Sequence, residues 1–145
     1  MKVVERVVQT QLVSYLESHH LIAPAQHGYR TNHSTETALN VITDRVLHAM
    51  DNGEIWILIL LDNSKCFDVV PHQNLLQKLE LYGVETQWFR DYLSGHTQQV
   101  RVRGAGGTSI TSRPRENNMG VYQGGSLTCV LFMLYSKRDL ARSVT

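Results

Sequence analysis

The sequence predicts a mixed α+β fold whose sheet is incomplete. Several segments place apolar residues at helical spacing, while the seven consecutive apolar residues 55–61 are typical of a strand buried on both faces. The rest of the chain offers few further strands that could pair with this run. The composition agrees with a globular core, since 42% of the 145 residues are hydrophobic and 19% are charged.

Two helices are expected before that strand. Residues 3–16 carry valine, leucine and tyrosine side chains at amphipathic spacing. Ser34 is a suitable N-cap for a second helix, which presents an apolar face between Ala38 and Met50. This second helix is expected to end at Asn52-Gly53, because both residues tolerate the left-handed conformation.

Three helices and one hairpin are expected after residue 61. Gly83 and Gly95 stop the first two helices, and a glycine-rich turn joins the strands of the hairpin. The expected elements are helices over about 72–82 and about 85–94, a hairpin of residues 98–103 with 108–112, and a helix in the apolar segment 127–134.

The charge distribution argues against a strongly basic domain, because the net charge is only +1. Basic residues are concentrated in the window from His96 to Arg115, which contains no acidic residue. Its arginines, Arg101 and Arg103 among them, could neutralise nucleic-acid phosphates. A solvated hairpin explains the same window equally well.

The sequence gives no indication of a disulfide-rich, zinc-binding, membrane-spanning or secreted protein. Cys66 and Cys129 are far apart, so neither a disulfide framework nor a zinc site is indicated. No apolar run approaches the length of about 20 residues that a membrane span requires. Glu5 and Arg6 interrupt what would have to be the apolar core of a secretory signal. We therefore expect an intracellular protein of the nucleus or cytoplasm with no membrane partner.

Asp62 is the residue that the sequence most strongly indicates as part of a functional site. A carboxylate directly after a buried strand is costly unless it is solvated, hydrogen-bonded or metal-bound, and ligands bind at strand ends in open sheets. Alternatively, Asp62 caps the following turn. Asp68 could be a second metal ligand or another cap. The glycine-rich segment 122–126 could hold phosphate at a helix start, or it is a plain turn.

Taken together, several blocks resemble the reverse transcriptase domain of non-LTR retrotransposons of the jockey or CR1 kind. They occur in the family's order and at its spacing, and they cover almost the whole chain. The blocks are Gln26-His27-Gly28-Tyr29-Arg30 with Ser34–Leu39, Leu61–His72 (resembling "LDLSKAFDTVDH"), Leu75–Leu93, and Gly120–Gly124 with Leu131–Tyr135 (resembling "GVPQGSVLGPLLFLLY").

The resemblance implies a fold of fingers plus palm and an RNA-directed DNA polymerase. Residues 1–53 would form part of the fingers, and residues 54–145 would form part of the palm with an incomplete sheet. The implied partners are an RNA template, a DNA primer and deoxynucleoside triphosphates. The sequence predicts no oligomeric state.

The resemblance also assigns roles to individual residues. Asp62 matches the aspartate that binds the two Mg²⁺ ions, which clamp the attacking hydroxyl and the leaving pyrophosphate. Asn63 would offer its backbone carbonyl as a further ligand. Phe67 matches the aromatic ring that leaves no room for a 2′-hydroxyl, and Gln123 and Gly124 match the loop beside the incoming nucleotide and the template.

The chain also departs from the family pattern. A turn similar to Tyr-Ala-Asp-Asp should follow residues 131–135, but residues 136–145 contain a single aspartate, Asp139, which matches a different family position. Cys66 and Tyr122 replace the usual alanine and proline. We therefore expect a truncated, decayed copy that is inactive alone, because Asp62 lacks the aspartates that complete a two-metal site.

Two alternatives remain open from the sequence. The first is a non-catalytic nucleic-acid-binding or protein-interaction module derived from such a polymerase, which the basic window favours. The second is a phosphotransfer enzyme with Asp62 as the nucleophile. This second alternative has less support, because Asn63 and Ser64 stand where such enzymes usually carry another aspartate.

Overall fold

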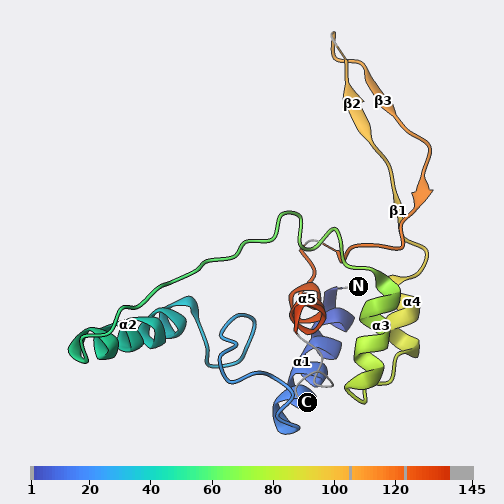
Figure 1. The fold of residues 1–145 in the computed structure, drawn as a ribbon. Helices are drawn as coiled ribbons and strands as arrows, with labels where there is room; N and C mark the ends of the chain where they lie inside the picture. Colours follow the sequence, from blue (N-terminus) through green and yellow to red (C-terminus); the bar gives the residue numbers. More distant parts are fainter. Residues whose placement is uncertain (1, 105, 123, 138–145) are drawn as a thin grey trace. The chain divides into compact units, whose positions relative to one another are not determined.

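The computed structural model describes residues 2–104, 106–122 and 124–137 (Figure 1). Within them the chain forms five α-helices and two small antiparallel sheets, which confirms the mixed α and β class. Internal contacts divide the chain into two units. The first unit comprises Met1–Ser64 with Gly125–Met133, and the second comprises Lys65–Gly124 with Leu134–Thr145.

The first unit contains α1 (Lys2–Ser18) and α2 (Thr35–Asp51). The N-cap prediction for α2 is confirmed: the Thr37 N–H donates to Ser34 Oγ over 3.2 Å, and the Ser34 N–H donates to Thr37 Oγ1 over 2.9 Å. This reciprocal pair satisfies two donors at the start of the helix. At the other end Gly53 is left-handed with φ 70°, whereas Asn52 remains right-handed, so only the glycine makes the expected reversal.

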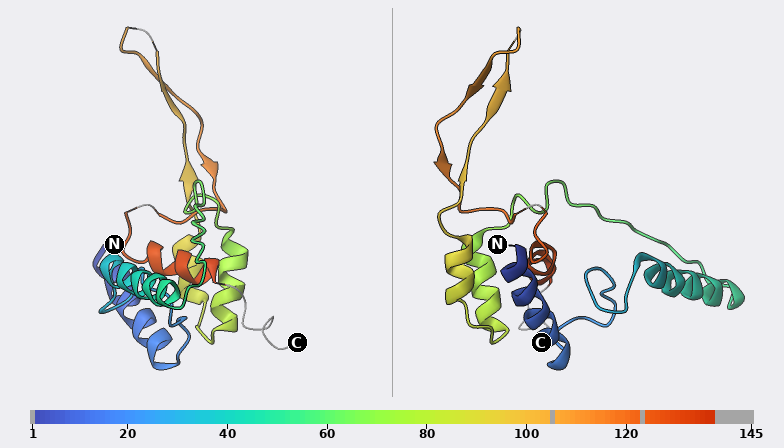
Figure 2. Two further views of the ribbon diagram at one scale, coloured as in Figure 1. Left: turned by 60° about the vertical axis from the view of Figure 1, so that its left-hand side comes forward. Right: turned by 180° about the vertical axis from the view of Figure 1, so that it is seen from behind.

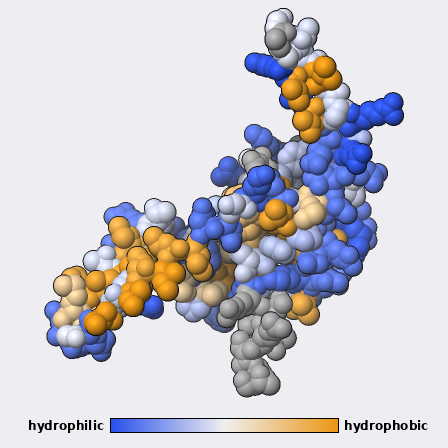
Figure 3. Space-filling model, turned by 45° about the horizontal axis from the view of Figure 1, so that its top comes forward, coloured by the Kyte–Doolittle hydropathy of each residue, from blue (hydrophilic) through white to orange (hydrophobic). Residues whose placement is uncertain are grey.

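The apolar face expected on α2 is not covered by the described residues. Within this helix only Ala49 is buried, and Leu39, Leu47 and Met50 expose more than half of their surface. Figure 3 accordingly shows many hydrophobic residues, in orange, on the surface of α2 and the segment that follows it. In α1, Leu12 and Leu16 are buried as expected, although Val3 near its start is 78% exposed.

The prediction of a buried central strand at residues 55–61 was wrong. The segment is extended but pairs with no other strand among the described residues. Its side chains lie largely in solvent, with Leu58 50% exposed and Ile59 75% exposed. Burial of a strand on both faces requires neighbouring strands and covering layers, and the described residues supply neither.

The second unit is built on two adjacent helices, α3 (His72–Leu81) and α4 (Gln87–Leu93), which lie side by side in Figures 1 and 2. Leu75 and Leu79 of α3 are fully buried, and Phe89 and Leu93 of α4 are nearly so. Both glycine stops are confirmed, since Gly83 and Gly95 follow the helices with left-handed φ angles of 75° and 68°.

A long two-stranded ribbon follows α4 (Figure 2). In it β1 (Thr97–Gln98) pairs with β4 (Arg115–Glu116), and β2 (Arg101–Arg103) pairs with β3 (Ser109–Thr111), both antiparallel. The hairpin prediction is therefore confirmed, except that the expected strand 98–103 is divided in two. All four strands are exposed on both faces.

The last described helix is α5 (Thr128–Ser136), as the apolar segment predicted. Val130 and Leu131 are fully buried. Near its end, Lys78 Nζ donates to the backbone carbonyls of Tyr135 and Lys137, each over 2.6 Å, which satisfies carbonyls that a helix end leaves unpaired. None of the helices in the described part of the chain has the length and hydropathy needed to cross a membrane.

Candidate nucleotide and nucleic-acid site

Asp62 and Asn63 belong to the first unit and directly follow the extended segment 55–61. Both side chains are exposed, so the Asp62 carboxylate is solvated and bears no burial cost. Carboxylate oxygen atoms such as those of Asp62 are ligands that Mg²⁺ prefers. However, no cluster of three potential ligand residues exists within the described residues, so the structure does not provide a complete metal site around this carboxylate.

Phe67 and Gly124 belong to the second unit. Phe67 is half-buried, and its backbone carbonyl accepts a hydrogen bond from the Val121 N–H over 2.8 Å. Gly124 is exposed with φ 89°, and a side chain placed on it would meet nothing within 4 Å. Gln123 and Asp139 lie outside the described residues.

Within the second unit, backbone hydrogen bonds connect residues 67–72 with residues 118–121, and we call this set of contacts the junction. Besides the Phe67–Val121 bond, the Gly120 N–H donates to the Val70 carbonyl over 2.8 Å and the His72 N–H donates to the Asn118 carbonyl over 3.1 Å. Pro71 and Met119 form an antiparallel bridge between these bonds. The junction therefore holds the Phe67 segment directly beside the segment that leads to Gly124.

Gly120 fits this junction because it has no side chain. Its φ is 85°, a conformation that disfavours residues with a Cβ. A Cβ there would also lie 3.1 Å from the Asp68 carbonyl oxygen and 3.2 Å from the Asp68 Cα. Both the backbone conformation and the close approach of Asp68 thus favour glycine at this position.

His72 is a residue that sequence reasoning missed. It is 9% exposed, and its Nε2 lies 2.7 Å from the Gly120 carbonyl oxygen. Because a carbonyl can only accept, Nε2 must carry the proton and donate. No local pattern marks this histidine, since its partner is 48 positions away in the sequence.

A cavity of about 650 Å³ lies beside the junction in the second unit. Its lining includes the charged residues Lys65 and Asp68 and the ring of Tyr122, which meets the His96 ring edge-on with centroids 5.0 Å apart. Tyr122 remains 56% exposed. The cavity thus combines an exposed aromatic ring with one positive and one negative side chain. Exposed aromatic rings are the surfaces on which nucleic-acid bases stack.

Arg101 and Arg103 lie on β2, opposite Thr111 and Ser109, and both are exposed. Residues of one strand separated by two positions point to the same face. The two guanidinium groups therefore share one face of the ribbon, which suits contact with successive phosphates.

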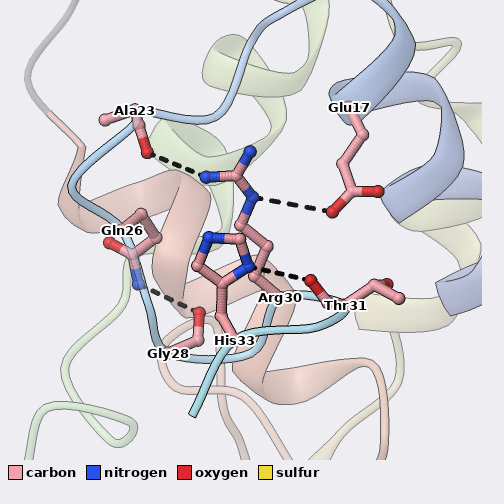
Figure 4. A network of polar contacts seen from close by, with 7 residues as sticks. All are labelled: Glu17, Ala23, Gln26, Gly28, Arg30, Thr31 and His33. Carbon is pink, nitrogen blue, oxygen red and sulfur yellow. Dashed lines mark hydrogen bonds and ion pairs between the residues drawn. The ribbon is translucent and has the colours of Figure 1, made fainter. Parts of the chain in front are cut away.

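In the first unit, residues 23–33 form a loop that surrounds Arg30 (Figure 4). Arg30 Nη1 donates to the Ala23 carbonyl over 3.5 Å, and its Nε lies 3.6 Å from Glu17 Oε1 of α1. Gln26 Nε2 donates to the Gly28 carbonyl over 3.1 Å. These contacts tie the loop to itself and to α1.

Comparison with known proteins defines the class of this chain. Residues 1–142 match the family model described as reverse transcriptase (RNA-dependent DNA polymerase). Because this match spans nearly the whole sequence, the chain belongs to the reverse transcriptase family.

Three polymerases of transposable elements from Drosophila melanogaster identify the kind of reverse transcriptase. The chain is 31% identical over 140 residues to the probable RNA-directed DNA polymerase from transposon X-element, and 28% identical over 141 residues to that from transposon BS. It is also 28% identical over 141 residues to the RNA-directed DNA polymerase from mobile element jockey. The resemblance to polymerases of non-LTR elements is thereby confirmed.

Each of these alignments covers 93% of this chain but only 14% or 15% of the transposon polymerase. The chain thus corresponds to a small part of those proteins. No solved structure matches it.

Proposed function

We propose that this chain forms part of the fingers and palm of an RNA-directed DNA polymerase, with residues 1–53 in the fingers and 54–145 in the palm. The substrates would be an RNA template, a DNA primer and deoxynucleoside triphosphates. The observation that carries the proposal is the family match over residues 1–142, which includes Asp62, Phe67 and the block from Gly120 to Gly124.

Asp62 would supply one carboxylate to a Mg²⁺ site, with the Asn63 carbonyl as a further oxygen ligand. Mg²⁺ would supply stabilisation of the charge that develops on the reacting phosphate. Two such ions about 3.5–4 Å apart repel each other and need several ligand charges, so Asp62 alone is insufficient. Activity would require carboxylates beyond those that the described residues bring to Asp62.

Phe67 would select the sugar, because its ring would occupy the space of a 2′-hydroxyl. Gln123 and Gly124 would lie beside the incoming nucleotide and the template. The junction supports this assignment, since the hydrogen bond from the Val121 N–H to the Phe67 carbonyl holds the two segments next to each other.

The test uses the isolated chain and a graft. Alone, the chain should incorporate no deoxynucleotide on a primed RNA template with Mg²⁺. Replacing the matching segment of the jockey polymerase by this chain should give an active graft, and Asp62→Asn should abolish its activity. Asp44→Asn, which alters an exposed carboxylate of α2, is the matched control and should leave activity unchanged.

Phe67→Ala in the same graft should raise ribonucleotide incorporation relative to deoxynucleotide incorporation. Template-dependent extension by the isolated chain, lost in its Asp62→Asn variant, would overturn the requirement for further carboxylates. An active graft that is indifferent to Asp62→Asn would overturn the role of Asp62.

A second candidate function is nucleic-acid binding without chemistry. The exposed ribbon favours it, because Arg101 and Arg103 share one face and the window His96–Arg115 contains no acidic residue to offset their charge. Salt-dependent RNA binding in the presence of a chelator, with no nucleotide incorporation, would support this candidate.

A further inference from the structure

We propose that a cavity in the first unit binds a phosphate group. The cavity has a volume of about 670 Å³, is open to solvent, and is lined by α1, by residues 29–33 and by the start of α5. Its lining contains none of the residues assigned to the polymerase site above. The proposal therefore stands apart from the proposed function and does not require it.

One wall is a single face of α1. Arg6, Thr10 and Ser14 line the cavity at intervals of four residues, and side chains at this spacing lie one above another on a helix. Arg30 and Thr31 contribute to the lining from the loop shown in Figure 4, and Ser126 contributes from the segment before α5.

Two buried donors in this lining have no hydrogen-bond partner among the described residues: Arg30 Nε and Ser126 Oγ. The neighbouring Glu17 Oε1 is 3.6 Å from Arg30 Nε, which is too long for a hydrogen bond. A buried donor left without a partner destabilises the fold, because it has lost its hydrogen bond to water and gained none in return. Two such donors on one cavity indicate that an acceptor belongs there.

The charge and chemistry of the lining favour an anion with several oxygens. The two guanidinium groups of Arg6 and Arg30 outnumber the one carboxylate, Glu17. The hydroxyl groups of Ser14 and Ser126 can also donate, whereas the Thr10 hydroxyl already donates to the Arg6 carbonyl over 2.9 Å. Donors converge from a helix, a loop and a second helix start. A phosphate group, whose oxygens accept in several directions, satisfies such an arrangement better than a planar carboxylate.

The lining also provides a reporter. Cys129 lines the cavity, whereas Cys66 belongs to the second unit and does not. Both thiols are free and half-buried, so each can react with N-ethylmaleimide and serve as the internal control for the other. A ligand in the cavity should shield Cys129 alone.

The experiment measures the alkylation rate of each cysteine in the full chain by mass spectrometry, with a chelator present to exclude metal-dependent effects. The probes are sodium tripolyphosphate, a deoxynucleoside triphosphate and a short single-stranded RNA. At about ten times the dissociation constant only about a tenth of the chain stays free, so Cys129 should react about tenfold more slowly. Protection by RNA alone would identify a nucleic-acid backbone as the source of the phosphate. Protection by tripolyphosphate and by the deoxynucleoside triphosphate would identify a free phosphate or a nucleotide phosphate as the source.

Variants separate binding from folding. Arg6→Gln and Ser126→Ala should each weaken the protection at least severalfold. Ser126→Ala should do so without lowering the stability of the ligand-free chain, because it removes an unsatisfied hydroxyl rather than a bond. Arg45→Gln, on the exposed surface of α2, should keep full protection. The proposal is overturned if no probe protects Cys129, if Cys66 is protected equally, or if Arg6→Gln and Ser126→Ala leave protection unchanged.

Discussion

His72 Nε2 donates a hydrogen bond to the carbonyl oxygen of Gly120 over 2.7 Å, joining two positions that are 48 residues apart. The backbone N–H of the same histidine donates to Asn118, so one residue holds the segment 118–120 from two sides. The segment carrying Phe67 and the segment leading to Gly124 are thereby fixed together. Two predictions concern this junction directly.

Replacing His72 by phenylalanine should loosen the junction. The change leaves the Gly120 carbonyl without its donor and should cost about 1–3 kcal/mol of unfolding free energy. Hydrogen exchange at the Gly120 and Val121 amides should accelerate. His72→Gln, which keeps a side-chain donor, should recover part of the protection, while His48→Phe on the exposed face of α2 should change neither amide. Unaltered exchange in His72→Phe would contradict the assignment.

Replacing Gly120 by alanine should be more costly than the same change at Gly107. Both glycines have a left-handed φ, 85° and 82°, so each loses about 1–2 kcal/mol from the backbone conformation. Only Gly120 has a backbone neighbour, Asp68, within 3.1 Å of the added Cβ. Urea denaturation should therefore give the lower midpoint for Gly120→Ala. Equal midpoints would show that the close approach of Asp68 is relieved without cost.

Truncation in the exposed segment 55–61 should hardly affect stability. Leu58→Ala and Ile59→Ala remove methyl groups that are already largely in solvent, so each should change the unfolding free energy by less than about 0.5 kcal/mol. Leu79→Ala, at a fully buried position, is the control and should cost about 2–5 kcal/mol. A large loss for Leu58→Ala would mean that the segment is buried in solution.

The same segment should promote self-association, because extended apolar residues without a strand partner are available for pairing with another copy. Ile57→Lys together with Ile59→Lys should reduce light scattering at high protein concentration. Thr43→Lys, an exposed polar position on α2, should not, since it adds charge without removing apolar surface from this segment. Equal scattering by all variants would exclude the segment as the associating surface.

Replacing Arg101 and Arg103 by alanine should weaken RNA binding. If each guanidinium neutralises one phosphate, the slope of log affinity against log salt should fall by about 1 for each arginine removed. Binding titrations at several salt concentrations would measure it, with Arg45→Ala as a control for net charge. An unchanged slope would identify the ribbon as an ordinary solvated hairpin.

Much of the local structure was predictable from the sequence, because its causes lie within a few residues. The Ser34 cap acts on Thr37, and the stops at Gly83 and Gly95 depend on the glycine's own freedom to adopt a left-handed φ. The order and spacing of the motif blocks likewise sufficed to indicate the reverse transcriptase family. The roles of Asp62, Asn63, Phe67, Gln123 and Gly124 rest on that resemblance and stay predictions.

Only the tertiary structure decided which surfaces are covered and which distant groups meet. The apolar run 55–61 has the composition of a buried strand, yet burial depends on partners, and none of the described residues pairs with it. The bond from His72 to Gly120 and the cavity that brings Arg30 together with Ser126 join residues far apart in the sequence. Such contacts could not be predicted from local pattern, because periodicity and capping describe only near neighbours, whereas packing is set by how separate segments meet in space.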